Sequence, residues 1–490
     1  MRAQPRRLVL FASLSLALLA PLVVASPAHA AHHDDYTFTI AAGEATITGY
    51  TGTDPHLDIP AAIVAGGTSY PVTTIGIAAF WVSSATSATV PDSVRTIEDY
   101  AFGMSSLTAV DLGNSVETIG AEAFARTQLT NVVIPDSTVT LHPYAFARNA
   151  LTSVTLGEGL EQIGVGAFMQ NNLGALRIPD SVTSIGNSAF TGAGITSLTL
   201  GSGLTTVGDS AFRDNAIPSV TLGDAVTDIG TYAFSVNELT EVHLGASVER
   251  IGYGAFMTNR ITSLRLNAGL RDIGEYAFRG NELTTVTIPA GLATIGTWAF
   301  YANPLSSAIF EGDAPTTFVA GHLLGASSAA VIYHYPQAQG FDPVSAGSPV
   351  RIVGAATSQL ALTALPGPGA THRASVEVRD DQGDPVAGVP VRFTFPAGTS
   401  AVSTNCTTDA VGQCGVDASF PAGLSPASRA QIGADANQLA VGDFPASPAA
   451  TPSELAATGA QGGWLAGIAL ALLATGTALM RTRRKRVRSA

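Results

Sequence analysis

The sequence predicts a β-rich solenoid built from 22-residue repeats, followed by a second, smaller β domain. Three observations support this prediction: phenylalanine recurs every 22 residues, apolar positions recur around each phenylalanine, and the composition changes near residue 356. A fixed period of this length is typical of repeat proteins, in which stacked coils share one continuous core. The recurring phenylalanines are Phe80, Phe102, Phe124, Phe146, Phe168, Phe190, Phe212, Phe234, Phe256, Phe278 and Phe300.

Each repeat contains a short strand and a compact segment around its phenylalanine. In the repeat of Phe234, residues 239–244 alternate at period two toward their end, which predicts a strand with Val242 and Leu244 facing inward. Ile229 lies five residues before Phe234, with a small alanine between them. This spacing favours a single helical or 3₁₀ turn packed behind the sheet.

Most repeats carry an asparagine three residues after the phenylalanine. We expect a buried asparagine there to hydrogen-bond the free backbone groups of neighbouring coils, because such groups need partners when they leave water. These residues are Asn149, Asn171, Asn215, Asn237, Asn259, Asn281 and Asn303.

The repeat, with its L-x-x-L-x-L and I-G-x-x-A-F segments, is similar to the leucine-rich repeats of BspA-like bacterial surface proteins. The resemblance covers about 36–355 and implies a leucine-rich-repeat solenoid with eleven repeats over 75–304. It also implies an N-terminal cap over 31–74 and a C-terminal cap over 305–355. The family resemblance implies binding rather than catalysis, and no cofactor is expected.

A second domain is predicted over 356–446, where three short runs alternate as strands with turns between them: 376–379, 389–395 and 415–420. The turns at 380–389 and 407–412 resemble those of bacterial Ig-like domains of the invasin and intimin type, which implies a β-sandwich. Cys406 and Cys414 flank the second turn. In an exported chain we expect them to form a disulfide, because a catalytic dithiol normally has closer spacing.

Both ends of the chain resemble targeting segments. Residues 1–30 combine three arginines, an apolar run and an A-x-A site at 28–30, which predicts a cleaved signal peptide. A retained membrane helix is the alternative. Residues 464–480 are apolar or small and predict a transmembrane helix, and the basic tail at 481–490 predicts a cytoplasmic end. Nucleic-acid binding by this tail is excluded by its position beside a membrane span.

A pentapeptide precedes the predicted span, within a linker over 447–463. It consists of Leu455, Ala456, Ala457, Thr458 and Gly459. With the span and the basic tail it resembles the L-A-x-T-G form of the cell-wall sorting signal of Gram-positive surface proteins, associated with high-GC actinobacteria. The resemblance implies that a sortase cuts after Thr458 and joins the chain to peptidoglycan, so we expect an exported protein on the cell wall.

The mature chain, 31–458, would be strongly acidic. It keeps all 37 acidic residues but loses nine of the 24 basic ones, so 15 remain and the net charge is −22. This charge argues against binding nucleic acid or anionic lipid.

A search for catalytic or metal-binding motifs finds little. The nine histidines form no H-E-x-x-H motif, and no G-x-S-x-G, phosphate-binding loop or dinucleotide motif occurs. The histidines and aspartates at 32–35 favour a frayed new N-terminus over a metal site. Asp380, Asp381 and Asp384 crowd one turn, where a solvated turn is favoured over weak Ca²⁺ binding. No metal site is predicted.

Two surfaces remain as candidates for binding an unknown protein or glycan ligand. The outward strand residues, expected on a concave face, are mostly serine and threonine, but Glu241, His243 and Arg265 fall on adjacent repeats. They form either one polar site or a structural Glu241–Arg265 salt bridge. The second surface is an aromatic row two residues before the phenylalanines, for which core-edge packing is the other interpretation. It comprises Tyr100, Tyr144, Tyr232, Tyr276 and Trp298. The alternative to a binding protein is a structural spacer or coat component of the cell envelope without a specific ligand.

Overall fold

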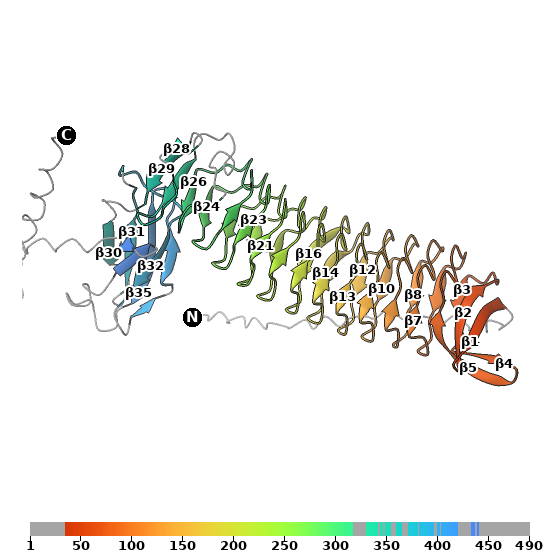
Figure 1. Ribbon diagram of the computed structural model, residues 1–490. Coiled ribbons are helices and arrows are strands. Elements are labelled where there is room, and N and C mark those ends of the chain that lie inside the picture. The colour runs from red at the N-terminus through yellow and green to blue at the C-terminus, as the bar shows by residue number, and fades with distance from the viewer. Residues whose placement is uncertain are drawn as a thin grey trace, which may run out of the picture.

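The computed structural model describes residues 35–316, 330–341, 344–345, 348–353, 359–364, 371–380, 382–395, 399–401, 403–419, 433–436 and 439–440. The predicted signal peptide, sorting motif, membrane span and basic tail lie outside these residues. Within them, no helix is long and apolar enough to cross a membrane. Figure 1 shows an elongated rod of stacked coils with a small β domain at its C-terminal end.

One strand of each coil belongs to a row that follows the long axis of the rod. In the described residues the row is divided into five short sheets, within which neighbouring strands of the row pair in parallel, in most cases at the 22-residue step, as Val132 pairs with Val154. The row consists of β3 (His56–Asp58), β6 (Ser87–Thr89), β8 (Ala109–Asp111), β10 (Asn131–Val133), β12 (Ser153–Thr155), β14 (Gly174–Arg177), β16 (Ile195–Thr199), β18 (Ser219–Thr221), β20 (Glu241–His243), β22 (Ser263–Arg265), β24 (Thr285–Ile288), β26 (Ser307–Phe310), β27 (Val331–His334) and β29 (Ser348–Ile352). The predicted strands are confirmed, and Val242 points inward as expected.

A second row of two-residue strands runs parallel to the first and continues into the N-terminal cap. Its strands are β7 (Thr96–Ile97), β9 (Thr118–Ile119), β11 (Thr140–Leu141), β13 (Gln162–Ile163), β15 (Ser184–Ile185), β17 (Thr206–Val207), β19 (Asp228–Ile229), β21 (Arg250–Ile251), β23 (Asp272–Ile273) and β25 (Thr294–Ile295). The cap adds β1 (Tyr36–Ala41), β2 (Glu44–Tyr50), β4 (Ala62–Ala65) and β5 (Thr68–Ile75). Strands β1 and β2 pair antiparallel, whereas β2 joins β5 in parallel.

The segment around each phenylalanine is not helical, so the predicted helical or 3₁₀ turn is wrong. In all eleven repeats the residues two before and two after the phenylalanine have left-handed backbone angles, as at Tyr100 (φ 61°) and Met104 (φ 55°). A residue in this region breaks a right-handed helix. Alternate N–H groups donate to the next coil instead, as from Phe102 to the carbonyl of Ala123 at 2.8 Å. We call this part of each coil the turn edge.

The core of the solenoid is a stack of phenylalanine rings. Neighbouring rings lie 4.8–5.5 Å apart between centroids, with planes within 9° of parallel. All eleven phenylalanines are buried. Because one coil buries little surface alone, its stability depends on the coils on either side.

The asparagines join neighbouring coils, as predicted. Asn237 Nδ2 donates to the carbonyls of Phe212 and Phe234 at 2.9 and 3.1 Å, and its Oδ1 accepts from the Ile217 amide at 3.1 Å. Three backbone groups buried beside the ring stack thus find partners. Where alanine replaces asparagine, at Ala193, the Leu173 amide donates to the Ala193 carbonyl instead.

In its described residues, the C-terminal domain forms two four-stranded antiparallel sheets. One sheet orders β30 (Gln359–Ala364), β31 (Thr371–Glu377), β35 (Gln413–Ser419) and β33 (Ser400–Ala401). The other orders β34 (Asn405–Thr407), β32 (Pro390–Thr394), β36 (Gly433–Ala436) and β37 (Leu439–Ala440). Val376 and Val416 of the first sheet share a core with Phe393 of the second. Its assignment to the Ig-like class stays a prediction.

This domain packs against the last coils of the solenoid. Ile309 and Tyr333, neighbours on β26 and β27, are buried in the core of the C-terminal domain rather than in the phenylalanine stack. The short β28 (Val344–Ser345) pairs with the start of β29. Further along β29, Arg351 donates to Asp380 at 2.7 Å and to Asp384 at 2.5 Å. The C-terminal domain is therefore joined to the solenoid by a shared core and an ion pair.

Candidate binding surfaces

The strand face is the outward surface of the long strand row, seven and nine residues after each phenylalanine. It is exposed and rich in hydroxyl groups over the middle coils, as at Thr199 and Thr221. Toward the C-terminal end the same positions become half-buried at Thr285 and Thr287 and buried at Ile309. Thr287 donates a hydrogen bond to the carbonyl of Gly388 at 3.3 Å. The C-terminal domain thus covers the end of the strand face and leaves its middle open.

The three charged residues predicted on this face lie together. Glu241 and His243 share β20, where His243 Nε2 lies 3.0 Å from Glu241 Oε1. Arg265 lies opposite His243 on β22, while Ser263 lies opposite Glu241. Glu241 therefore pairs with His243 rather than with Arg265. All three side chains are exposed, with no hollow around them among the best-formed pockets of the described residues.

The electrostatic influence of Arg265 extends to Glu311, which follows β26. Burial raises the pKa of the Glu311 carboxyl, and the positive charge of Arg265 acts in the opposite direction. Arg265 thus helps to keep a half-buried carboxylate charged, a structural role that needs no ligand.

The acidic turn and the cysteines have structural roles in the C-terminal domain. Asp380 is fully buried, and its Oδ1 accepts from the amides of Gln382 and Asp384, each at 2.9 Å. Since Arg351 occupies the remaining oxygen, this turn is held by an arginine rather than by Ca²⁺. Cys406 and Cys414 form a disulfide between β34 and β35, with Cα atoms 5.9 Å apart. Within the described residues, no group of three or more candidate ligands is placed to hold a metal ion.

Aromatic side chains form a continuous row on the turn edge near the C-terminal end of the solenoid. Tyr232, Tyr276 and Trp298 were expected on one side of the coils, and Tyr253 and Tyr301 join them. The centroid distances are 5.1 Å for Tyr232–Tyr253, 5.4 Å for Tyr253–Tyr276, 5.4 Å for Tyr276–Trp298 and 6.3 Å for Trp298–Tyr301. We call these five residues the aromatic row. It lies outside the phenylalanine stack, and core-edge packing remains the alternative interpretation to binding.

The aromatic row is partly open to solvent and flanked by arginines. Tyr253, Trp298 and Tyr301 are 36–39% exposed. The guanidinium of Arg213 lies 5.2 Å from the Tyr232 ring centroid, and that of Arg279 lies 5.5 Å from Tyr276. Such stacking orients the rings and the cations together.

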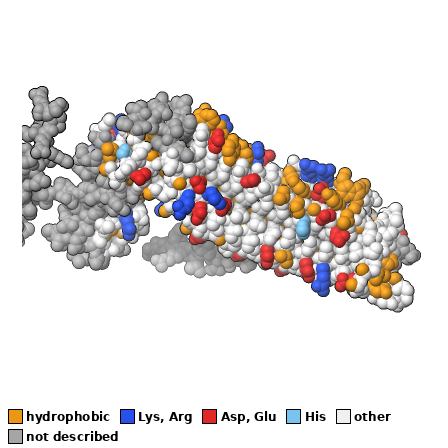
Figure 2. Space-filling model, viewed as in Figure 1, with side chains coloured by type: hydrophobic (Ala, Val, Ile, Leu, Met, Phe, Trp, Pro, Cys, Tyr) orange, Lys and Arg blue, Asp and Glu red, His pale blue; other side chains and the backbone are white. Residues whose placement is uncertain are grey.

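Tyr100 and Tyr144 lie on the same edge but outside this row. Tyr100 contacts Trp81 edge-on at 5.6 Å between centroids, near the N-terminal end. Hydrophobic side chains gather in two groups along the upper edge of the rod in Figure 2. The exposed aromatic residues of the described chain lie on the turn edge and not on the strand face: Trp81, Tyr100, Tyr144, Tyr253, Trp298 and Tyr301.

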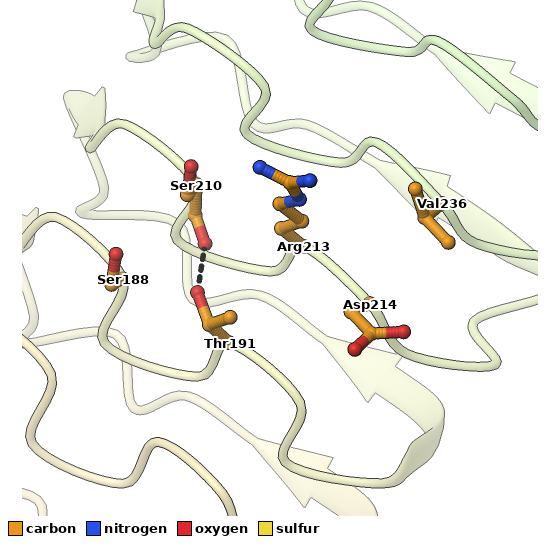
Figure 3. Close-up of a pocket in the computed structure, with 6 residues that line it drawn as sticks. All are labelled: Ser188, Thr191, Ser210, Arg213, Asp214 and Val236. Carbon is orange, nitrogen blue, oxygen red and sulfur yellow. Dashed lines mark hydrogen bonds between the residues drawn. The ribbon is translucent and has the colours of Figure 1, made fainter.

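A shallow hollow of about 440 Å³ lies on the turn edge beside the aromatic row (Figure 3). Its lining consists of Ser188, Thr191, Ser210, Arg213, Asp214 and Val236, from three successive coils. The hollow exists because the repeat of Phe190 carries small residues at positions where the next repeat carries Arg213 and Asp214. Thr191 donates to the Ser210 carbonyl at 2.6 Å, which ties two of these coils together.

Comparisons with known proteins support the repeat assignment. The family model described as "BspA type Leucine rich repeat region" matches residues 73–196 and 183–307, in six copies. No curated protein sequence matches the chain.

Several solved structures resemble it. The pneumococcal vaccine antigen PcpA is 20% identical with a TM-score of 0.45, over 64% of this chain and 96% of that one. A leucine-rich repeat protein from Bacteroides ovatus is 18% identical with a TM-score of 0.42, over 65% and 98%. A leucine-rich cell surface protein from Faecalibacterium prausnitzii is 22% identical with a TM-score of 0.35, over 65% and 96%. With TM-scores below 0.5, these likenesses say nothing of what this chain binds. On the 22-residue repeat, the two strand rows and the family match, the repeat region at 73–307 belongs to the BspA-type leucine-rich repeat family.

Proposed function

We propose that the chain is exported, is attached to the cell wall by its C-terminal sorting signal, and binds a ligand with its repeat region. The observation that carries the binding proposal is the exposed aromatic row on the turn edge. Tyrosine, tryptophan and arginine are the side chains that most often anchor binding interfaces. A repeat domain has no structural need to gather three exposed aromatic rings, Tyr253, Trp298 and Tyr301, in one place.

The attachment proposal rests on the order of the sequence features. A signal peptide over 1–30 would export the chain, and the Leu455–Gly459 pentapeptide, the span at 464–480 and the basic tail would follow the folded domains. A sortase would then join Thr458 to peptidoglycan. The C-terminal domain, which we propose to be Ig-like, would hold the solenoid away from the wall.

A structural spacer of the cell envelope is the second candidate. The buried contacts of Ile309, Tyr333 and Arg351 with the C-terminal domain favour it, because they make one stiff body from two domains. A spacer needs stiffness but no ligand.

A binding screen separates the two candidates. The purified full chain, kept soluble in detergent, is applied to arrays of host proteins and glycans. We expect saturable binding that weakens when Tyr253 and Trp298 are both changed to alanine. If every spot stays at background, or if the double variant binds as well as the parent, the binding proposal fails and the spacer candidate remains.

A further inference from the structure

We propose that the aromatic row and the hollow beside it form one binding site for a neutral polysaccharide laid along the solenoid axis. This inference rests on the proposed binding function and names the chemical class of its ligand. The site extends from Ser188 to Tyr301 on the turn edge.

The first argument is the repeating geometry of the row. The first four rings, Tyr232, Tyr253, Tyr276 and Trp298, come from successive coils at 5.1–5.4 Å between centroids, and Tyr301 shares the coil of Trp298. Coils repeat at about the spacing of paired β-strands, near 4.8 Å. The row thus offers one aromatic contact per coil to a polymer laid along the axis, with neighbouring ring planes turned by 74°, 69° and 38°. A globular protein partner instead needs a compact patch of roughly 800 Å² with pockets for its side chains.

The second argument is the mixture of flat apolar rings and polar groups at one end. A sugar ring presents an apolar face of C–H groups, which stacks on the negatively charged face of an aromatic ring, and a rim of hydroxyls. Ser188, Thr191, Ser210, Arg213 and Asp214 supply donors and acceptors in the hollow that adjoins Tyr232. Among the described residues, neither Arg213 nor Asp214 takes part in an ion pair. Both are therefore open to hydrogen-bond with sugar hydroxyls.

The third argument is the charge of the site, which selects an uncharged ligand. The arginines Arg213 and Arg279 are matched by the carboxylates Asp214 and Glu275. A hydrogen bond with Tyr232, with burial second, raises the pKa of Tyr253 to about 12, so Tyr253 carries no phenolate charge at physiological pH. The chain as a whole is acidic and repels polyanions. Because the arginines and carboxylates of the site balance locally, the site itself favours no charged polymer.

Affinity electrophoresis of the full chain tests this inference. Gels are cast with soluble neutral polysaccharides (hydroxyethyl cellulose, starch and galactomannan) or with the acidic polymers hyaluronan and polygalacturonate. We expect retardation by at least one neutral polymer and by neither acidic one. The Tyr253→Ala and Trp298→Ala double variant should lose about tenfold or more in affinity, since each ring is exposed and contributes stacking rather than core packing.

Two further variants keep the result interpretable. Tyr100→Ala removes an exposed aromatic residue at the same repeat position but outside the row, and should bind like the parent. Arg213→Ala with Asp214→Ala should weaken binding while the circular dichroism spectrum stays unchanged.

Three outcomes overturn the inference: no retardation by any neutral polymer, retardation by the acidic polymers alone, or equal retardation of parent and double variant. Protein binding through the row in the array screen, with no retardation in the gels, would leave the proposed binding function standing and reject the polysaccharide.

Discussion

A buried side chain in the solenoid stabilises the coils on either side of it as well as its own coil. Phe190 stacks on Phe168 and Phe212 at 5.4 Å each, so its removal leaves a gap shared by three coils. Thr199 lies at an exposed position of the strand face, on the coil that Phe190 supports. The two residues differ in burial while sharing one repeat, which makes them a matched pair.

Phe190→Ala should lower the free energy of unfolding by about 3–5 kcal/mol, because a buried ring is replaced by a cavity. Thr199→Ala should stay within about 0.5 kcal/mol of the parent. Urea melts followed by circular dichroism compare the two. Equal effects would mean that the inner and outer faces of the coil are reversed.

The burial of Glu311 predicts that the free energy of unfolding depends on pH. Burial raises the pKa of this carboxyl in the folded chain above its ordinary value of 4.5, partly offset by Arg265. Below pH 4.5 both folded and unfolded chains keep the proton, so there is no penalty. As the pH rises, the unfolded chain ionises first, and the folded chain loses stability until its own raised pKa is passed.

Glu311→Gln should therefore be more stable than the parent at pH 7, and the difference should shrink to zero as the pH falls below 4.5. Urea midpoints at pH 4, 5.5 and 7 measure the effect, with the exposed Glu238→Gln as the control. A constant difference across these values would contradict the proposed burial effect.

At the scale of elements, the sequence was sufficient for features that its period encodes. The phenylalanine stack, the inward strand residues and the asparagine contacts all follow from positions 22 residues apart. The turn was predicted wrongly because left-handed residues such as Tyr100 and Glu122 have no distinctive side-chain signature. The signal was present in glycines at the same positions of other repeats, namely Gly166, Gly192, Gly254 and Gly280.

The candidate surfaces were also predicted only where the 22-residue period encodes them. One repeat position predicted Tyr232, Tyr276 and Trp298 together, but Tyr253 and Tyr301 occupy other positions and reach the row only through the turn geometry. The sequence placed Glu241, His243 and Arg265 on neighbouring strands correctly. The contact between Glu241 and His243 depends on side-chain conformation, which the repeat does not fix. The hollow at Ser188 requires three coils in space and has no motif.

The contact between solenoid and C-terminal domain gives a prediction at this scale. Arg351 is the cation that neutralises the fully buried carboxylate of Asp380. Arg351→Ala should lower the free energy of unfolding of the C-terminal domain by about 3–5 kcal/mol, because an uncompensated buried charge remains.

The control is Arg373→Ala, whose ion pair with Asp417 at 3.5 Å is exposed and should contribute no more than about 1 kcal/mol. Limited proteolysis across a urea series, read for cleavage between 354 and 440, measures both variants. Indistinguishable cleavage profiles would show that the Arg351 pair does not secure the domain.

At the scale of the whole molecule, the described residues form an elongated rod, a shape that suits display away from a surface. The ring stack and the two strand rows connect the coils, and the shared core at Ile309 and Tyr333 connects the last coils to the C-terminal domain. The aromatic row lies near the C-terminal end of the solenoid, on its turn edge. A ligand could thus contact the side of the rod over several coils.

Covalent attachment to the cell wall is the property on which this proposed role most depends. Cells expressing the full chain are fractionated, the wall is digested with a muramidase, and the released protein is analysed by mass spectrometry. We expect a C-terminal peptide that ends at Thr458 and carries a peptidoglycan fragment, with the segment from Gly459 onward absent. Recovery of the intact chain from the membrane fraction, basic tail included, would contradict wall attachment and leave the membrane span as the only anchor.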